Sequence, residues 1–200
     1  MPDYWERSYR SGEMGWDIGR STPIFDQWIK TCKEPLLICV LGAGNGWDAI
    51  HFASRGHAVT AVDFSESAVK NMQSSVEKYR IKIDIRHMDI FNLHQMFTNH
   101  FDVVLEYTCF CAIDPLRRRD YLEMVYDILK PNGELFATLP YDLNLFNRKT
   151  IFTGHSYQEF VYKKFGHYKH HTFFSEYLLK FMLNVSSLNI NSLHYLYYNR

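Results

Sequence analysis

The stretch VLGAGNGWDAI, residues 40–50, places three glycines at alternate positions directly behind an apolar run. Residues 36–42, LLICVLG, have the length and the continuous apolar character of a strand that is buried on both faces. Residues 45–56 follow with the pattern of a helix that ends at a glycine. Glycine at such a turn lets a ligand approach the backbone without a Cβ in the way. The first candidate binding residues are therefore Gly42, Gly44 and Gly46.

The alternation of strand and helix patterns continues along the chain. Further strands are predicted at 57–63, 81–89, 101–107, 134–140 and 192–198, and helices at 22–33, 65–79, 115–130, 156–165 and 175–187. This alternation is typical of an α/β domain with a mostly parallel sheet, here of six or seven strands flanked by helices. We expect one domain over residues 1–200. In it a cover segment (1–35) precedes a binding core (36–140) and a C-terminal part (141–200) that completes the sheet and the acceptor side.

Two ligands require a glycine loop of this kind, namely a dinucleotide and S-adenosylmethionine. A dinucleotide fingerprint needs glycine at positions 42, 44 and 47, whereas position 47 is Trp47. Asp63 ends the next predicted strand, where a carboxylate accepts hydrogen bonds from a ribose diol. Asp89 follows the third predicted strand and is flanked by apolar residues. This setting suits an adenine, because the carboxylate can accept a hydrogen bond from the exocyclic amine. The pattern favours a nucleoside ligand without a pyrophosphate on the helix N-terminus.

Each of these elements also has a purely structural interpretation. A glycine-rich turn can serve chain geometry alone. Asp63 can act as a helix N-cap, although Ser65 competes for that position, and Asp89 can be a solvated turn residue. Their joint occurrence at successive strand ends favours the binding interpretation.

The composition of the chain limits the classes of partner and the cellular locations that we expect for it. The 200 residues are 46% hydrophobic, and 22 basic side chains balance 22 acidic ones. A polyanion such as DNA calls for a basic face, so we expect no nucleic-acid partner. No run of 18 apolar residues and no signal-peptide pattern occurs, so no membrane association is expected. The four cysteines form no disulfide framework, and a reducing cytoplasm fits them best.

Two polar clusters are expected not to hold a metal ion, and an arginine run is expected not to bind a ligand. Cys109-Phe110-Cys111 and the group His167, His170 and His171 lack the spacing of a four-ligand zinc site, so no metal is predicted. The run 117–119, three arginines, is interpreted as the solvated face of a helix, with contact to an anionic substrate as the alternative.

Three stretches of the chain carry a family resemblance. They are Trp5 followed by WDIGR and a proline (16–23), the glycine loop with GNGWDAIHFASRGHAVTAVD (44–63), and FDVVLEYTCFCAIDP (101–115) with LKPNGEL (129–135). They resemble class I S-adenosylmethionine-dependent methyltransferases, and more narrowly the thiopurine methyltransferase-like group, which includes thiol, halide and thiocyanate methyltransferases. The resemblance covers about residues 1–140.

The resemblance implies site roles by position. Trp5 and Trp16 would lie on an N-terminal cover above the cofactor. The cofactor-binding set would be the three loop glycines with Asp63, Phe64, Met88, Asp89, Ile90, Glu106 and Tyr107. The acceptor pocket would be walled by Tyr9, Phe110 and Cys111. Because residues 6–22 are polar and glycine-dotted, we expect the cover to be mobile without cofactor.

The C-terminal third departs from that family. Relatives carry a G-G-P-P-Y turn after the fifth strand, and the equivalent here, residues 154–157, lacks both prolines. A thiol acceptor needs no catalytic base, because a few per cent of it is thiolate at neutral pH. A hydroxyl acceptor would need one, for which His155 and Tyr157 are the candidates.

The sequence therefore predicts an enzyme that transfers a methyl group from S-adenosylmethionine to a small molecule, most simply at sulfur. The alternatives are O- or N-methylation of another metabolite, a non-catalytic nucleoside-binding regulator, and a nicotinamide oxidoreductase. Trp47 disfavours the last of these. The oligomeric state is expected to be a monomer or a homodimer.

Overall fold

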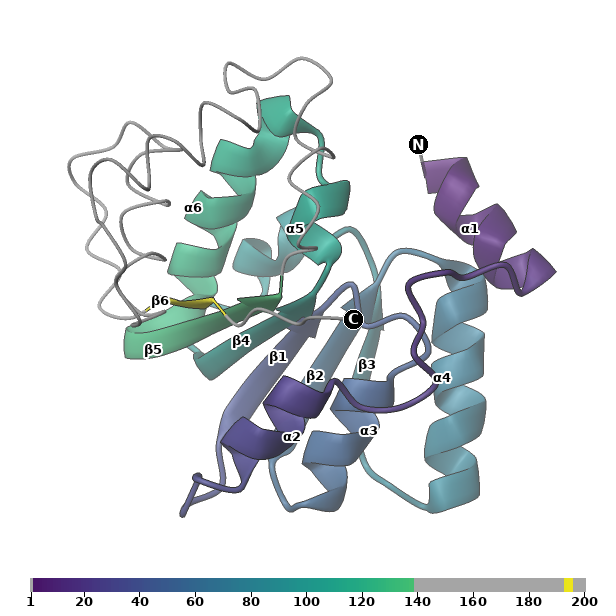
Figure 1. Ribbon diagram of the computed structural model, residues 1–200. Helices are drawn as coiled ribbons and strands as arrows, with labels where there is room; N and C mark the ends of the chain where they lie inside the picture. The colour runs from purple at the N-terminus through teal and green to yellow at the C-terminus, as the bar shows by residue number, and fades with distance from the viewer. Residues whose placement is uncertain (1, 139–192, 196–200) are drawn as a thin grey trace, which may run out of the picture.

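A computed structural model describes residues 2–138 and 193–195 of the chain (Figure 1). The predicted helices at 156–165 and 175–187, and the candidate bases His155 and Tyr157, lie outside the described residues. So do most of the predicted strand at 192–198 and the histidine cluster.

Six strands form a single sheet in the order β3-β2-β1-β4-β5-β6, and every neighbouring pair is parallel. The strands are β1 (Leu37–Leu41), β2 (Ala58–Asp63), β3 (Asp84–His87), β4 (Phe101–Tyr107), β5 (Leu129–Thr138) and β6 (Leu193–Tyr195). The predicted α/β fold with a mostly parallel sheet is confirmed. Because all strands point the same way, their carboxyl ends form one edge, where ligands of open α/β sheets bind.

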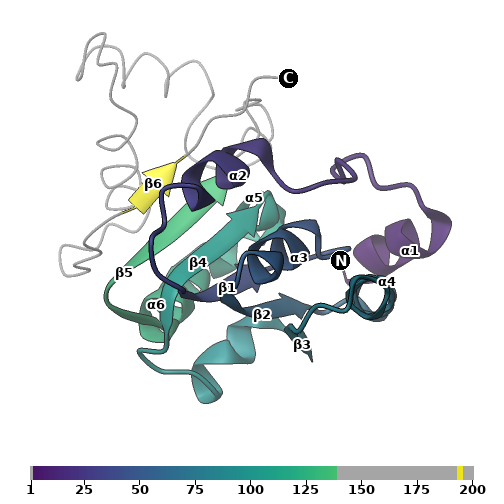
Figure 2. The ribbon, with the colours of Figure 1, turned by 90° about the horizontal axis from the view of Figure 1, so that it is seen from below.

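Helices cover both faces of this sheet. On one face lie α2 (Pro23–Ile29), α3 (Trp47–Ser54) and α4 (Glu66–Tyr79), and on the other η1 (Ile90–Gln95) and α6 (Arg118–Ile128). Figure 2 shows α2 and α3 on one side of the strands and α6 on the other. Successive residues of β1 divide between the two cores: Ile38 and Val40 pack under α2 and α3, whereas Cys39 and Leu41 pack under α6.

Local capping chemistry fixes the start of α4. Ser65 is extended, and its Oγ accepts the backbone N–H of Ala68 at 3.1 Å. This hydrogen bond satisfies one of the donors that a helix N-terminus leaves free. Ser65 is thus the N-cap, as its position predicted, and Asp63 is left for another role.

The N-terminal segment contains a helix that its sequence pattern did not predict. Helix α1 (Pro2–Ser11) packs against α4, and Figure 1 shows it near one end of that helix. Asp3 in its first turn and Arg10 in its last complement the helix dipole. A polar, glycine-dotted segment therefore gains helical structure from a tertiary contact.

The junction between α6 and β5 also differs from expectation. The helix ends at Ile128, and β5 begins at the next residue, so the expected helix stop at Pro131-Asn132-Gly133 lies inside the strand. Asn132 has φ +67, and the pairing register with β4 shifts after Phe101. The left-handed conformation of Asn132 and the shifted pairing let β5 continue through residues 131–133, although their sequence is typical of a turn.

Among the described residues, no helix has both the length and the apolar composition that a membrane span requires.

Candidate functional site

The glycine loop follows β1 at the carboxyl edge of the sheet, and this chain's own side chains lie against all three glycines. A Cβ on Gly42 would meet Cys109 Sγ at 2.9 Å, and a Cβ on Gly44 would meet the Tyr9 hydroxyl at 2.5 Å. A Cβ on Gly46 would overlap Met72 of α4. Gly44 and Gly46 are consequently buried, whereas Gly42 is exposed. The bare backbone thus serves close packing at Gly46 and leaves Gly42 open to a ligand.

Asp63, the last residue of β2, is aimed at this loop. Its side chain is 5% exposed. Oδ2 accepts the backbone N–H of Gly44 at 2.8 Å, and Oδ1 accepts that of Ser65 at 2.8 Å. Burial raises the pKa of Asp63, and the hydrogen bonds from Ser65 and Gly44 oppose the rise. A carboxylate has about four lone-pair sites, and the backbone N–H groups of Ser65, Gly44 and Phe64 act on this one, so Asp63 keeps capacity for a hydrogen bond from a diol.

Tyr9 of the N-terminal segment lies over the loop, and Trp5 and Trp16 form one aromatic cluster with it. Trp16 packs edge-on against Trp5 and Tyr9, with ring centroids at 4.8 and 5.9 Å. Its indole N–H donates to the Tyr9 hydroxyl at 3.4 Å. Burial and the nearby Asp63 carboxylate raise the pKa of Tyr9, which therefore stays a neutral phenol. Tyr9 was predicted as an acceptor-pocket residue, and the structure places it over Gly44 beside the predicted ribose carboxylate.

A carboxylate follows each cover tryptophan and ties the segment down. After Trp5, Glu6 accepts from Ser65 Oγ at 2.7 Å and from Ser67 Oγ at 2.6 Å. The hydroxyl groups of Ser67 and Ser65 lower the pKa of Glu6 to about 2. The cover is thereby fixed to the N-terminus of α4.

After Trp16, Asp17 makes the second tether. Its Oδ1 accepts the indole N–H of Trp47 at 2.9 Å, and its Oδ2 accepts the side-chain amide of Asn45. A third tether closes the segment, where Asp48 accepts the backbone N–H and the hydroxyl of Thr22 at 2.7 and 2.8 Å. Sequence reasoning missed all three tethers, although the acid that follows each cover tryptophan was a visible signal.

The end of β3 brings the predicted adenine residues to the same edge. Asp89 caps η1, with Oδ1 accepting the N–H of Phe91 at 3.0 Å, and the Oδ2 of its half-exposed side chain lies 4.0 Å from the Arg117 guanidinium. Ile90 is buried, and Met88 packs partly against the core. Phe64 is 40% exposed beside them, with its carbonyl 2.9 Å from His87 Nε2. The turn role of Asp89 is therefore real, and its second oxygen is half-exposed and faces Arg117.

The arginine run is not a uniformly solvated face, as the sequence had led us to expect. The Arg117 guanidinium stacks on the Phe91 ring at 3.6 Å from its centroid, 4.0 Å from the Asp89 carboxylate. Arg118 lies over the ring of Phe110 at 5.2 Å. Only Arg119 makes an exposed helix-surface pair, with Glu123 at 2.9 Å. The first two arginines hold α6 and the segment before it against aromatic rings instead.

Glu106, near the end of β4, and Thr108, directly after it, have unusual environments. Glu106 is 0% exposed, and one oxygen accepts the backbone N–H of Phe110. Its Oε1 has no hydrogen-bond partner among the described residues, and burial raises the pKa of Glu106 to about 8. Thr108 has φ +59, which is rare for a β-branched residue and typical of functional loops. Tyr107, between them, is half-buried.

The predicted acceptor wall is only partly supported. Phe110, in the short helix α5 (Cys109–Ala112), is 4% exposed and packs against Tyr121 at 5.4 Å, so its ring belongs to the core beneath α5. Cys111 is half-buried, and its thiol donates to the Thr108 carbonyl at 2.8 Å. Burial raises the pKa of Cys111 to about 12, which keeps this thiol protonated.

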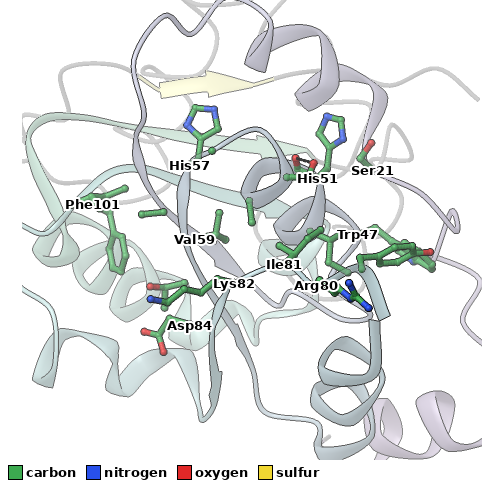
Figure 3. A pocket seen from close by; sticks show the side chains of 18 of the residues that line it. Ser21, Trp47, His51, His57, Val59, Arg80, Ile81, Lys82, Asp84 and Phe101 are labelled. Carbon is green, nitrogen blue, oxygen red and sulfur yellow. Dashed lines mark hydrogen bonds between the residues drawn. The ribbon is translucent and has the colours of Figure 1, made fainter. Parts of the chain in front are cut away.

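A groove of about 1150 Å³ lies away from these residues (Figure 3). It is lined by the first residues of β1 to β4 (Leu37, Ala58, Asp84 and Phe101), by the outer side of α3, and by loop residues such as His57 and Lys82. These strand starts are the opposite edge of the sheet from the glycine loop. The groove is therefore separate from the candidate site.

Taken together, the described edge combines a buried carboxylate, an exposed glycine, a half-exposed acid beside apolar residues and an aromatic cover. Such a set can hold a ribose, an adenine and a cationic group, because aromatic faces attract cations.

Comparison with known proteins identifies the family of this chain. The sequence model of the family described as Thiopurine S-methyltransferase (TPMT) matches residues 1–147. Thiocyanate methyltransferase 1 of Brassica oleracea is 33% identical over 140 residues, which are 68% of this chain and 60% of that protein. Probable thiol methyltransferase 2 of Arabidopsis thaliana is 30% identical over 140 residues, with the same shares. The chain thus spans about 60% of the length of these curated relatives.

Among solved structures, the fold is similar to a 1,6-didemethyltoxoflavin-N1-methyltransferase of Burkholderia thailandensis, crystallised with S-adenosylhomocysteine. The TM-score is 0.58 at 24% identity, over 66% of this chain and 57% of that one. At this identity the likeness supports the fold.

Proposed function

Because the chain belongs to the thiopurine S-methyltransferase family, we propose that it transfers a methyl group from S-adenosylmethionine to the sulfur of a small acceptor, a thiol or thiocyanate. The observation that carries the proposal is Asp63, a buried carboxylate whose two backbone hydrogen bonds aim it across the glycine loop. Few ligands other than a ribose diol match such an acceptor at this place in an α/β sheet.

The remaining residues fit the other parts of the cofactor. Asp89 offers its half-exposed Oδ2, which also faces Arg117, to the adenine amine, with Phe64, Met88 and Ile90 as apolar neighbours. Gly42, which is exposed, leaves its backbone open to the methionine end, and Glu106 lies on the neighbouring strand β4, paired with Leu41. Trp5, Trp16 and Tyr9 cover the loop. These roles, and that of Tyr107, belong to the proposal.

The charge of the site suits methyl transfer. When bound, S-adenosylmethionine supplies an electrophilic methyl group on a sulfonium whose positive charge disperses during transfer. Strong anionic stabilisation of the ground state would therefore slow the step. Burial raises the pKa of Glu106 to about 8, so this carboxyl is largely neutral at pH 7 and adds little negative charge. The aromatic cover instead excludes water and offers ring faces to the cation.

The chain need not supply a base for a sulfur acceptor. A thiol with an ordinary pKa near 8.5 loses its proton to solvent often enough at neutral pH. The thiolate sulfur then forms the new S–C bond as the sulfonium S–C bond breaks. Methylation at oxygen or nitrogen would rest on His155 or Tyr157, which lie outside the described residues.

The test is a calorimetric titration with S-adenosylhomocysteine, with NADH as the control ligand. We expect micromolar binding to the wild type and a loss of at least tenfold, about 1.4 kcal/mol, in Asp63→Ala. Transfer of a labelled methyl group to thiocyanate and to an aromatic thiol follows, with the matching phenol as the oxygen control. Failure of the folded chain to bind S-adenosylhomocysteine would overturn the proposal.

Three further expectations remain predictions. They are a cytoplasmic location, the absence of a nucleic-acid partner, and a monomeric or homodimeric state.

A further inference from the structure

Trp47 occupies the position where a dinucleotide-binding loop would have its third glycine, and its side chain has a defined partner. It is the first residue of α3, so its position is set by the helix and not by the loop. Its indole N–H donates to Asp17 Oδ1 at 2.9 Å, 30 residues away in the sequence. A hydrogen bond to a carboxylate is about twice as strong as one between neutral groups.

The other oxygen of Asp17 extends the link to the glycine loop. Oδ2 accepts from Asn45, and Asn45 Oδ1 in turn accepts from Asn71 Nδ2 of α4 at 2.9 Å. The N–H of Gly19 donates to Oδ1 at 2.7 Å. Asp17 is thus hydrogen-bonded to the first residue of α3 and to the loop before it, and it is linked through Asn45 to α4.

Asp17 is bonded in sequence to Trp16, which orders the rest of the cover. Trp16 donates to the Tyr9 hydroxyl, and that hydroxyl lies over Gly44, the residue before Asn45. The path from Trp47 through Asp17 and Trp16 to Tyr9 therefore starts and ends at the glycine loop. It sets where the aromatic cover lies relative to the loop.

We propose that Trp47 is a positioning residue for the cofactor, acting through Asp17 to hold the cover over the glycine loop. The proposal rests on the proposed function and deepens it, because it assigns control of cofactor retention to a residue beside the site. Trp47 itself fixes the cover, and the cover touches the ligand. Loss of the indole N–H then loosens the cover without removing any cofactor-contacting group.

The experiment compares Trp47→Phe with Trp28→Phe. Both variants lose an indole N–H, but Trp28, in α2, is partly buried and its ring packs on Phe52 and Phe136 of the core. Trp47→Phe should raise the Kd for S-adenosylhomocysteine about tenfold, chiefly through faster dissociation. It should also speed tryptic cleavage at the exposed Arg7, Arg10 and Arg20 of the ligand-free cover. Trp28→Phe should leave the cleavage rate of the cover unchanged.

A double-mutant cycle tests the route. If Trp47 acts through Asp17, Trp47→Phe should have little further effect on Kd in the Asp17→Ala background. Additive losses would overturn the inference, as would a Trp47→Phe variant with the Kd and cleavage rate of the wild type. A wild type that does not bind S-adenosylhomocysteine would instead overturn the proposed function. The cleavage comparison would still test whether Trp47 fixes the cover.

Discussion

The carboxylate of Asp63 and the backbone N–H of Gly44 are joined by a hydrogen bond of 2.8 Å. Beside it, the N–H of Ala43 donates to the carbonyl of Val62 at 2.9 Å, so the loop after β1 is fixed to the end of β2 by adjacent bonds. The loop conformation and the orientation of the carboxylate therefore depend on each other. A substitution at either residue should therefore alter both the loop conformation and the orientation of the carboxylate.

Gly44→Ala is expected to displace the cover. The residue has φ +55, and a Cβ there would lie 2.5 Å from the Tyr9 hydroxyl. The left-handed backbone costs an alanine about 1–2 kcal/mol, and Tyr9 must also move. Gly12→Ala is the matched control, because Gly12 has φ +76 with no atom within 4 Å of a Cβ. Both variants should lose stability by urea unfolding, but only Gly44→Ala should expose Tyr9 to tyrosine nitration. Equal nitration in the two would contradict the packing.

Glu106 should make the protein less stable as the pH rises. Burial raises its pKa from an ordinary value of 4.5 to about 8, so the folded state favours the protonated form. The stability that this group contributes is full below pH 4.5 and is lost as the pH rises through about 8, with a slope of up to about 1.4 kcal/mol per pH unit.

Glu106→Gln should therefore flatten the pH dependence of the unfolding free energy, most clearly between pH 6 and 8. Asp48, whose pKa burial raises to about 6, affects the lower part of the range in both proteins. Glu123→Gln, on the surface of α6, serves as the control and should keep the wild-type slope. An unchanged slope in Glu106→Gln would mean that this carboxyl ionises normally.

Glu6 should have the opposite pH dependence. The Ser67 and Ser65 hydroxyls lower its pKa from 4.5 to about 2, so its contribution is present above pH 4.5 and is lost as the pH falls through about 2. Glu6→Gln should destabilise the chain at pH 7, and the difference from wild type should shrink below pH 4.5. Glu13→Gln, in the same segment, should match the wild type throughout. A constant difference between pH 3 and 7 would exclude the carboxylate as its source.

Thr108→Gly is expected to stabilise the protein. Thr108 has φ +59, and its side chain makes no capping hydrogen bond, while its N–H and carbonyl bonds to Thr138 and Cys111 persist in glycine. Relief of a β-branched residue in this conformation outweighs the entropy cost of glycine, for a net gain of about 0.5–1 kcal/mol. Thermal unfolding would show it, and a lower Tm than wild type would show that the conformation carries no strain.

The positions of the strands along the chain could be predicted because a buried parallel strand is continuously apolar. Cys39 and Val40 face opposite cores, so neither can be polar, and the sequence records this directly. The carboxyl-edge positions of Gly42, Asp63 and Asp89 followed from the alternation alone. Ser65 was predictable as an N-cap because that choice depends on local geometry.

The tethers of the cover could not be predicted in the same way. Glu6 and Ser67 are 61 residues apart, and no local pattern indicates that they meet. Helix α1 likewise depends on its contact with α4. Phe110 was assigned to the acceptor wall from the family resemblance, and its ring packs in the core beneath the one-turn helix α5. Long-range contacts decided each of these cases.

The tryptophans are distributed unevenly, and this gives the chain a built-in optical reporter. Trp5 and Trp16 contact each other, and Trp47 is bonded to the residue next to Trp16, whereas Trp28 is fixed in the core. Three of the four indoles thus share the environment of the N-terminal segment. The near-ultraviolet circular dichroism and intrinsic fluorescence of the whole protein are dominated by that segment, so they record its movement with no label attached.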